Sequence, residues 1–381
     1  MVGRKPLISI VEVEGGEQEH MRYLFFTNTP AHVHLYKHAV RELRERGHDV
    51  LVLGRDYGPT ESLLEYYDLP YRIYGRCDTT KTSLLKSLPG SYLRIARSVR
   101  RYDPDLIFGM GAYSAHAGAL AGVPVVLLLD SEPTGIDHMV SRPFAKLILT
   151  PHVFGKDLGD KHYRFRGFKE CAYLHPAVYE PGVDIREALG VNENEKYAVL
   201  RLNAFGSHHD VSHSGLTPGR RRALIERLAE HATVFVSDEG RSMNYDNVDA
   251  RPLDLHPGLI HDALAEAHLL VADTQTMVTE AALLGTPAIR SNSFVGEDDM
   301  GNFVELEREE LIYNIADFEQ VIETAEELMA DDTVTETWRE RRDAYMAGKV
   351  NLTALIVDVA LNGAIPARVD GLSRQPVLRP A

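Results

Sequence analysis

The sequence predicts an α/β protein with two doubly wound, parallel-sheet domains. Short apolar runs typical of buried strands alternate with helical patterns, and such alternation is typical of parallel sheets. The alternation occurs in two separate series, and the weakly periodic stretch Lys161–Pro181 lies between them as a predicted linker. A chain of 381 residues is long enough for two domains with substantial cores. A single doubly wound domain would leave the second series unexplained.

The first series defines a predicted domain over residues 21–165. Residues 1–20 have no periodic pattern and are predicted to form a disordered extension. The predicted strands are Arg22–Thr27, Val50–Leu53, Tyr71–Tyr74, Leu106–Phe108, Val125–Leu129 and Leu147–Thr150. The predicted helices are His34–Arg46, Ser62–Tyr67, Leu84–Arg101 and Tyr113–Ala121.

The second series defines a predicted domain over residues 166–335. Its predicted elements include strand Lys196–Leu202, helix Pro218–Glu230, strand Thr233–Ser237, helix Pro257–Ala267 and helix Asp317–Met329. Residues 336–363 are predicted to form C-terminal helices, from the patterns of Val334–Tyr345 and Leu352–Leu361. The composition of residues 364–381 predicts a disordered tail.

The segment LLVADTQTMVTEAALLGTPAI, residues 269–289, predicts a strand, a turn rich in hydroxyl groups, a short helix and a second strand. Asp273 or Thr274 suits the helix N-cap, because its side chain can accept from the free amides of the first turn. Gly285 suits a left-handed C-cap, and Pro287 prevents further helix.

The helix within this segment has a predicted binding face. Met277, Ala281 and Leu284 share one side and are expected to be buried on the sheet. Thr276 and Glu280 are then expected to face outward above the carboxyl ends of the strands. The free amides and partial positive charge of a helix N-terminus suit a phosphate or diphosphate, and Glu280 can accept from ribose hydroxyls. The structural alternative is an ordinary βαβ unit with a glutamate on its helix.

This segment resembles the donor-site motif of GT-B glycosyltransferases and of non-hydrolysing UDP-N-acetylglucosamine 2-epimerases. Glu280–Ala281 and Gly285–Pro287 match the E-A-x-x-x-G-x-P helix of those families. Thr274, Gln275 and Thr276 stand in place of the usual glycines. The resemblance implies that the helix amides and these side chains hold a nucleotide diphosphate, while Glu280 holds the ribose.

The span from Met21 to Gly363 resembles an archaeal family known as domain of unknown function 354, a member of the GT-B group. The phrases that carry the resemblance are NTPAHVHLYKHAVRELRERGHDV, RGFKECAYLHP, RLNAFGSHHD and DTQTMVTEAALLGTPAIRSNSFVGEDDMGNF. The resemblance implies two Rossmann-like domains that face each other across a cleft, with the last helix packed back on the first domain. It implies a fold and no particular reaction.

Three residues of the first domain are candidates for catalysis. His32 lies near the start of a predicted helix, where the dipole disfavours imidazolium, so a neutral ring can act as a base on an acceptor hydroxyl. Asp130 and Glu132 follow strand Val125–Leu129, and two carboxylates in one cleft can divide acid and base roles. Glu132 resembles the catalytic glutamate of the epimerase H-V-E-A-G motif. The structural alternatives are helix capping by Asp130 and packing or solvation of the histidine.

Further candidates for substrate binding follow the strands of the second domain. Arg201, His208 and His209 lie where the epimerases have a T-x-H-R motif that reaches the diphosphate. Arg290 precedes a loop that covers the donor in GT-B proteins. A metal site at His208, His209, Asp210 and His213 is a weaker alternative, because adjacent histidines diverge on an extended chain. Lys169 is expected either to neutralise a phosphate or, as the safer interpretation, to pair with Glu170.

Composition excludes several classes of protein. The net charge of −15 argues against nucleic-acid binding, which needs a basic face. No apolar run approaches the ~20 residues that span a bilayer, and no signal peptide is recognised. Two cysteines imply no disulfide framework and fit a cytoplasmic location. Scarce lysine with abundant acid suggests adaptation to high salt, and the alternative is a mesophile whose high-GC genome favours arginine over lysine.

The leading hypothesis is a metal-independent glycosyltransferase without a cofactor, which uses a nucleotide-sugar donor and a glycan or lipid-linked acceptor in surface-glycan synthesis. An isomerase of the 2-epimerase type is the alternative. Those enzymes have a carboxylate in a G-D-T motif after the fourth strand, and here that place reads Gly109–Tyr113, without a carboxylate. A nucleotide-sugar-binding protein without catalysis is the third hypothesis. The sequence does not specify the sugar, the acceptor or the oligomeric state.

Overall fold

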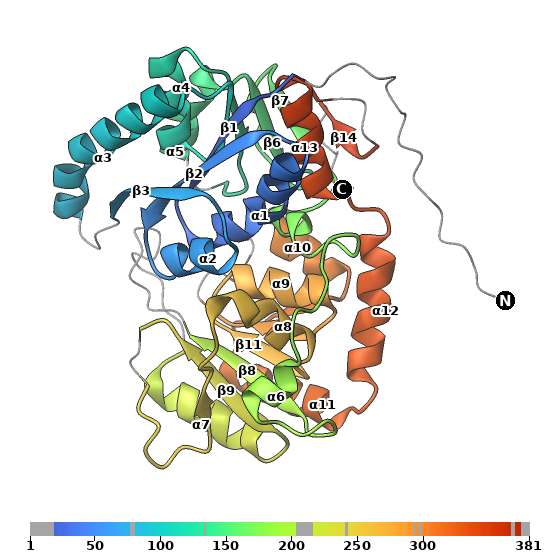
Figure 1. Cartoon of the computed structure of the whole chain (residues 1–381). Helices are drawn as coiled ribbons and strands as arrows, with labels where there is room; N and C mark the ends of the chain where they lie inside the picture. The colour runs from blue at the N-terminus through green and yellow to red at the C-terminus, as the bar shows by residue number, and fades with distance from the viewer. Residues whose placement is uncertain are drawn as a thin grey trace.

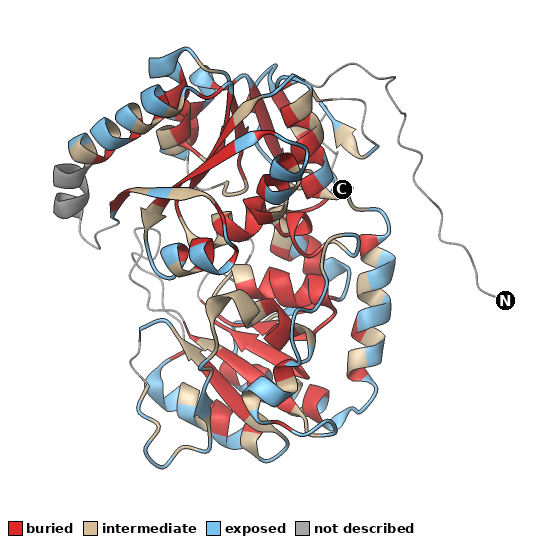
Figure 2. Cartoon of the chain, viewed as in Figure 1, coloured by how far each residue is buried: buried red, intermediate tan, exposed pale blue. Residues whose placement is uncertain are grey.

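The computed structural model describes residues 19–76, 81–132, 135–202, 216–240, 243–292, 295–296, 299–366 and 370–374. Two parallel sheets with interleaved helices lie one above the other, and the predicted fold class is confirmed (Figure 1). The strands are largely buried in both halves, whereas many of the helices packed on them keep exposed outer faces (Figure 2). Within the described part of the chain, no helix is both long and apolar enough to cross a bilayer.

The sheet of the first half has the strand order β14-β7-β6-β5-β4-β1-β2-β3. Its strands are β1 (Arg22–Thr27), β2 (Asp49–Asp56), β3 (Tyr71–Arg76), β4 (Leu106–Gly109), β5 (Val125–Leu128), β6 (Leu147–Pro151), β7 (His162–Phe165) and β14 (Leu372–Ser373). Its helices are α1 (Pro30–Glu45), α2 (Thr60–Tyr66), α3 (Lys81–Tyr102), α4 (Ala112–Ala121) and α5 (Gly135–Ser141). All pairs are parallel except the pair of β14 with β7.

The sheet of the second half has the order β10-β9-β8-β11-β12-β13, with every pair parallel. Its strands are β8 (Tyr197–Leu202), β9 (Thr233–Asp238), β10 (Arg251–Pro252), β11 (Leu269–Ala272), β12 (Ala288–Arg290) and β13 (Ile312–Asn314). The helices after β7 are α6 (Ile185–Leu189), α7 (Pro218–Ala229), α8 (Ile260–Ala265), α9 (Thr276–Leu284), α10 (Gly301–Arg308), α11 (Phe318–Ala330), α12 (Val334–Met346) and α13 (Leu352–Leu361).

Both sheets contain the doubly wound order in which the chain moves outward from a central strand, returns and continues on its other side. The direction reverses between β1 and β4 in the first sheet and between β8 and β11 in the second. In such folds ligands bind at this switch point, beyond the carboxyl ends of the strands. The topology therefore indicates where a ligand site is expected in each half.

The last two helices connect the halves. Helix α12 runs along one side of the second half, and α13 lies against α1 in the first half (Figure 1). The Tyr23 hydroxyl donates to the Ala360 carbonyl at 3.2 Å, so β1 and α13 are hydrogen-bonded although they are far apart in sequence. Gly285 ends α9 with φ +80°, and a Cβ there would lie 3.0 Å from the Arg339 Cα of α12. This position therefore requires glycine both for its conformation and for the packing of α12.

Several element predictions need correction. The predicted linker contains strand β7 and the 3₁₀ helix η2 (Lys169–Ala172). Strand β7 was missed because His162 and Arg164 interrupt its apolar pattern, yet both are buried and hydrogen-bonded to Thr150 and to the Lys156 carbonyl. Residues 372–373 of the predicted disordered tail form β14, which pairs with β7.

Two helix starts also differ from the prediction. Helix α1 begins at Pro30, four residues before the predicted start, because proline suits the first turn where an amide is not needed. Helix α9 has Gln275 as its N-cap, with no side-chain hydrogen bond to the first turn, so neither Asp273 nor Thr274 caps it. The first-turn amides of α9 are therefore not occupied by a capping side chain.

Candidate functional site

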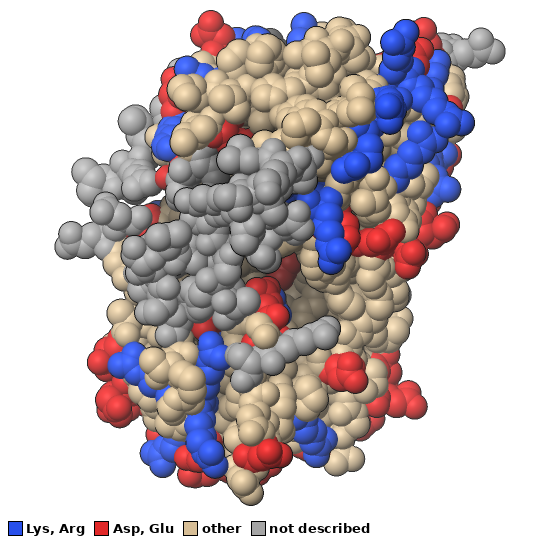
Figure 3. Space-filling view, turned by 90° about the vertical axis from the view of Figure 1, so that its left-hand side faces the viewer, with Lys and Arg blue, Asp and Glu red and all other residues tan. Residues whose placement is uncertain are grey.

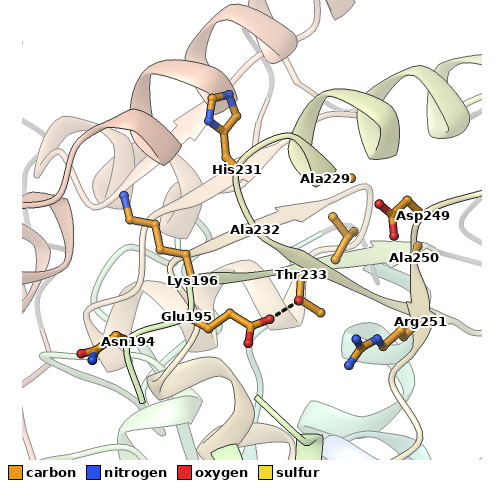
Figure 4. A pocket seen from close by; sticks show the side chains of 11 residues that line it. Asn194, Glu195, Lys196, Ala229, His231, Ala232, Thr233, Asp249, Ala250 and Arg251 are labelled. Carbon is orange, nitrogen blue, oxygen red and sulfur yellow. Dashed lines mark hydrogen bonds between the residues drawn. The ribbon is translucent and has the colours of Figure 1, made fainter. Parts of the chain in front are cut away.

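Two concave regions of the described structure are large enough for a small ligand. The first, about 540 Å³, is lined by residues such as Glu195, Thr233 and Arg251 (Figure 4). Glu195 precedes β8, whereas Thr233 and Arg251 begin β9 and β10, so this cavity lies at the amino ends of the strands. Ligands of doubly wound sheets bind at the opposite ends. We therefore place the candidate site in the second region.

The second region, here called the central cavity, has a volume of about 430 Å³ and lies between the two halves. Its walls come from the carboxyl-end loops of both sheets and from the segment that joins them. The lining residues are Thr29, Asp130–Glu132, Pro151, Val153–Phe154, Phe168–Glu170, Gln275–Thr276, Thr279 and Met300–Phe303. The surface is hollowed between the upper and lower halves in Figure 3. The structure thus brings the predicted residues Asp130, Glu132, Gln275 and Thr276 together.

The wall from the second half consists of two helix N-termini. Helices α9 and α10 begin at Thr276 and Gly301, and both residues line the central cavity. The Thr274 hydroxyl, just before α9, is buried and has no hydrogen-bond partner in the described structure. Helix N-termini offer free amides and partial positive charge. This wall is therefore suited to an anionic group.

Glu280 does not occupy the open position that was predicted. It is 4 % exposed, and its Oε1 accepts from the Tyr173 hydroxyl at 2.8 Å and lies 3.0 Å from His261 Nε2. Burial by itself would raise the pKa of Glu280, but the His261 ring and these hydrogen bonds outweigh it and lower the pKa. The prediction of an exposed helix face was wrong because α8 and the segment after η2 cover it.

The two predicted arginines are also held by protein groups. Arg201 donates to Ser237 at 2.7 Å and pairs with Glu239, while its Nε has no partner among the described residues. Arg290 is fully buried and pairs with Asp299. Its guanidinium lies 3.7 Å from the centroid of Phe303, a residue that lines the central cavity. Arg290 therefore supports the cavity wall from behind and is not itself part of the lining.

His32 lies in the first turn of α1, close to Asp130. Burial is the main cause that lowers the pKa of His32 to about 3, so the ring is neutral near neutral pH. Its Nδ1 accepts from the Asn28 amide at 3.2 Å. A neutral ring that accepts at Nδ1 carries its proton on Nε2, so Nε2 is a hydrogen-bond donor. This geometry favours a hydrogen-bonding role over the predicted role as a base.

The part of the lining that comes from the first half and from η2 carries carboxylates. Asp130 forms an ion pair with Lys169, and Lys169 Nζ lies 3.5 Å from Glu170 Oε1. Burial opposes the charge of Asp130, but the ammonium and its hydrogen bond outweigh burial and lower the pKa of Asp130. Glu132 is half-buried, and its Oε1 accepts from the Gly155 amide at 3.0 Å. The Lys156 ammonium donates to the backbone carbonyl of Glu132, so the contacts with Gly155 and Lys156 fix the orientation of this residue.

Sequence reasoning missed Lys169 and Glu170 as lining residues. It placed them in a linker and expected Lys169 either to neutralise a phosphate or to pair with Glu170, whereas the structure places both in η2 beside Asp130. The signal available was two adjacent charged residues in an otherwise apolar stretch, Phe168–Leu174. Their partner lies 39 residues earlier in the chain, so local pattern could not identify it.

The remaining predicted site residues cannot be placed. His208, His209, Asp210 and His213 lie outside the described residues. Cys77 also lies outside, whereas Cys171 is buried, and burial raises its pKa to about 12. Over the described ranges, no group of three or more histidine, cysteine or acidic side chains is arranged to hold a metal ion.

A buried carboxylate outside the cavity joins the two halves. Glu305 of α10 pairs with His152, which follows β6, at 2.8 Å and with Lys349, which follows α12, at 2.8 Å. The Tyr345 hydroxyl of α12 donates to the same carboxylate at 2.5 Å. These contacts outweigh burial and lower the pKa of Glu305 to about 2.

Comparison with known proteins gives the same architecture. An uncharacterised protein of Methanocaldococcus jannaschii is 22 % identical over 279 residues, which is 70 % of this chain and 80 % of that protein. The UDP-N-acetylglucosamine–N-acetylmuramyl-(pentapeptide) pyrophosphoryl-undecaprenol N-acetylglucosamine transferase of Nitratidesulfovibrio vulgaris is 34 % identical over 120 residues. That match covers 28 % of this chain and 31 % of the transferase, so the chain matches less than a third of that relative.

Among solved structures, the UDP-GlcNAc 2-epimerase from Neisseria meningitidis bound to UDP-GlcNAc superposes with a TM-score of 0.64. The match covers 90 % of this chain and 100 % of the epimerase at 13 % identity, so it shows a shared fold. The model of one family, described as protein of unknown function (DUF354), matches residues 22–362. The chain therefore belongs to the DUF354 family and has the GT-B fold.

Proposed function

We propose that this protein is a glycosyltransferase that binds a nucleotide-activated sugar in the central cavity and transfers the sugar to an acceptor hydroxyl. The observation that carries the proposal is that two unlike sets of groups line one cavity. The N-termini of α9 and α10 form one set, and Asp130, Glu132 and the Lys169–Glu170 pair form the other. Diphosphates are bound by helix N-termini, and sugar hydroxyls donate to carboxylates.

In this proposal the diphosphate lies at the start of α9, near Thr276 and the unpartnered Thr274 hydroxyl. Helix amides aimed at the diphosphate stabilise the charge that develops on it as the bond to the sugar breaks. Glu132 lines the cavity with a half-buried side chain and is the proposed base that accepts the proton of the acceptor hydroxyl. His32 Nε2 is a proposed donor to the sugar or acceptor.

The matched proteins support a nucleotide-sugar ligand, because one is named as an N-acetylglucosamine transferase and another was solved with UDP-GlcNAc. Transfer is preferred over epimerisation because the segment after β4 lacks a carboxylate of its own. Asp137 of α5 reaches this place, but it accepts from the Ala112 amide at 3.1 Å and so serves the first turn of α4. The acceptor class, glycan or lipid-linked, stays open in this proposal.

The test is a thermal-shift panel of nucleotide sugars, followed by mass spectrometry of any stabilising ligand after incubation. A ligand at a hundredfold its dissociation constant stabilises the folded state by about 2.7 kcal/mol, so binding is expected to raise the melting temperature. Thr276→Ala is expected to remove much of that shift, because Thr276 lines the cavity at the start of α9 and loss of a hydrogen bond to a charged group costs about 1.5–3 kcal/mol.

Because Thr276 is half-buried, any change of stability without ligand is accounted for by measuring each shift against the variant's own melting temperature. Glu323→Gln, an exposed change on α11, is the control and should retain the full shift. Equal shifts for Thr276→Ala and the unaltered protein would contradict the proposed diphosphate contact at the start of α9. Absence of any shift across the panel would contradict the proposed ligand class.

A further inference from the structure

Three charged side chains that line the central cavity lie close together, although one of them is far from the other two in sequence. Lys169 makes its ion pair with Asp130, and its Nζ is 3.5 Å from Glu170 Oε1. Glu170 is 4 % exposed but lines the cavity together with the other two residues. Burial removes most of the water that would otherwise solvate its charge.

The charges of this cluster do not balance. One ammonium faces two carboxylates, and the hydrogen bond of Lys169 goes to Asp130. Glu170 is left with the longer, weaker contact, so it is the carboxylate whose ionised form is least compensated. Two carboxylates that share one site cannot both ionise as easily as separated ones.

The charged groups around Glu170 stay ionised near neutral pH. The carboxylates of Asp130 and Glu280 have lowered pKa values, because their ion pairs and hydrogen bonds outweigh burial. Burial would lower the pKa of Lys169, but the carboxylates of Asp130 and Glu170 outweigh burial and raise it. Burial is the main cause that raises the pKa of Glu170 to about 7, with Lys169 opposing and Asp130 and Glu280 adding to it. Near neutral pH, Glu170 is therefore the member of this group whose proton occupancy can change.

The Glu170 carboxyl and the N-terminus of α9 line the same cavity. We infer that Glu170 takes up a proton when a nucleotide diphosphate binds in the central cavity. This inference rests on the proposed function and adds to it a residue that adjusts the charge of the site to an anionic ligand. Negative charge brought into the cavity disfavours the carboxylate form, and the proton comes from the buffer, with no covalent step.

The inference has a consequence for affinity. Proton uptake on binding means that the ligand binds better where the proton is available. Affinity is expected to be constant below about pH 7, where Glu170 is already protonated, and to fall above it by up to about tenfold per pH unit. Lys37, whose pKa is lowered to about 8 chiefly by burial, also titrates in this range, but it is not among the cavity-lining residues.

The experiment is calorimetric titration with UDP-N-acetylglucosamine in buffers of different ionisation enthalpy, at about pH 7.5. The diphosphate of a nucleotide sugar has no group that titrates near neutrality, so any proton exchanged belongs to the protein. Net uptake of a substantial fraction of one proton is expected. Glu170→Gln should still bind, with no uptake and with a flat pH profile between about pH 6 and pH 8. Glu180→Gln, an exposed change, is the matched control and should retain the uptake.

A second measurement does not depend on ligand binding. Carbon-13 NMR of the free protein should detect one carboxyl that titrates near neutral pH and is absent from Glu170→Gln. Asp130→Asn should lower that pKa, because Lys169 then pairs with Glu170 alone, and the uptake near neutral pH should disappear. A residue with only a structural role would not respond in this way.

The results that would overturn this inference differ from those that would overturn the proposed function. Binding without proton uptake, or uptake that persists in Glu170→Gln, would overturn the inference and leave the proposed function standing. The absence of any carboxyl titrating near neutrality would overturn it as well. Failure of every nucleotide sugar to bind would overturn the proposed function and this inference together.

Discussion

Replacement of Glu305 by glutamine should weaken the junction between the two halves more than any surface change. The carboxylate receives hydrogen bonds from His152, Tyr345 and Lys349, which belong to segments from both halves. Glutamine preserves the shape of the side chain but removes its charge. The buried Lys349 ammonium, 8 % exposed at its side chain, is then left without its anionic partner.

The expected loss of stability in Glu305→Gln follows from the pKa shift of Glu305. Its contacts lower the pKa from 4.5 to about 2, and each unit of difference between folded and unfolded states corresponds to about 1.4 kcal/mol. The ionised carboxylate therefore contributes on the order of 3 kcal/mol to the free energy of unfolding at neutral pH. Removal of one partner of a buried ion pair typically costs about 3–5 kcal/mol, which agrees with this value.

The sign of the pH dependence is fixed by the same shift. Because the pKa of Glu305 is depressed in the folded state, its contribution is present above the unfolded pKa of about 4.5. It is lost as the pH falls toward about 2, where the folded protein also binds the proton. The difference in stability between Glu305→Gln and the unaltered protein should therefore shrink to less than about half its neutral value by about pH 3.

Urea unfolding followed by fluorescence provides the assay. The chain has a single tryptophan, and Trp338 is buried in α12, where its Nε1 donates to the Leu311 carbonyl at 2.9 Å. Its emission therefore reports loss of α12 from the second half. Glu340→Gln, an exposed change on the same helix, is the control and should alter stability by less than about 0.5 kcal/mol. A loss below about 1 kcal/mol for Glu305→Gln at neutral pH, or a difference independent of pH, would refute the reasoning.

Two further predictions concern the reaction and the response to salt. The protein should not interconvert UDP-N-acetylglucosamine and its manno epimer, because Gly109–Tyr113 supplies no carboxylate after β4. Incorporation of deuterium at C2 during incubation in heavy water would contradict this prediction. With a net charge of −15, the protein should gain stability in molar potassium chloride, which screens repulsion among its acidic groups. A melting temperature that stays flat from low to molar salt would show that the acidic composition is not an adaptation to salt.

The fold was predictable because most of the strands at the centre of the two sheets carry an apolar pattern of their own. Strand β1, for example, has the predicted bounds Arg22–Thr27. Where polar residues are buried, the pattern fails, as at His162 and Arg164 of β7. A strand whose polar side chains are buried and hydrogen-bonded within the protein cannot be recognised from hydrophobicity alone.

The candidate site was predictable only in part, for a related reason. Asp130, Glu132, Gln275 and Thr276 were predicted from their places after strands, and parallel strands bring such places to one edge. The position of Glu280 required knowledge of which distant segment covers α9, and that segment includes Tyr173. The pattern of a helix indicates which face is apolar, but it does not indicate which segment of the chain packs on each face.

The junction and the proposed ligand wall share one helix, which links stability to binding. Helix α10 starts at Gly301, where a Cβ would lie 2.7 Å from the Val153 carbonyl oxygen of the first half. Glycine is required there because the two halves approach closely, and this approach places the first residues of α10 in the central cavity beside α9. One turn further along, Glu305 ties the same helix to His152 and Lys349. Since the amides that face the cavity are held by contacts that also join the halves, a ligand at those amides contacts a surface that exists only while the halves are together.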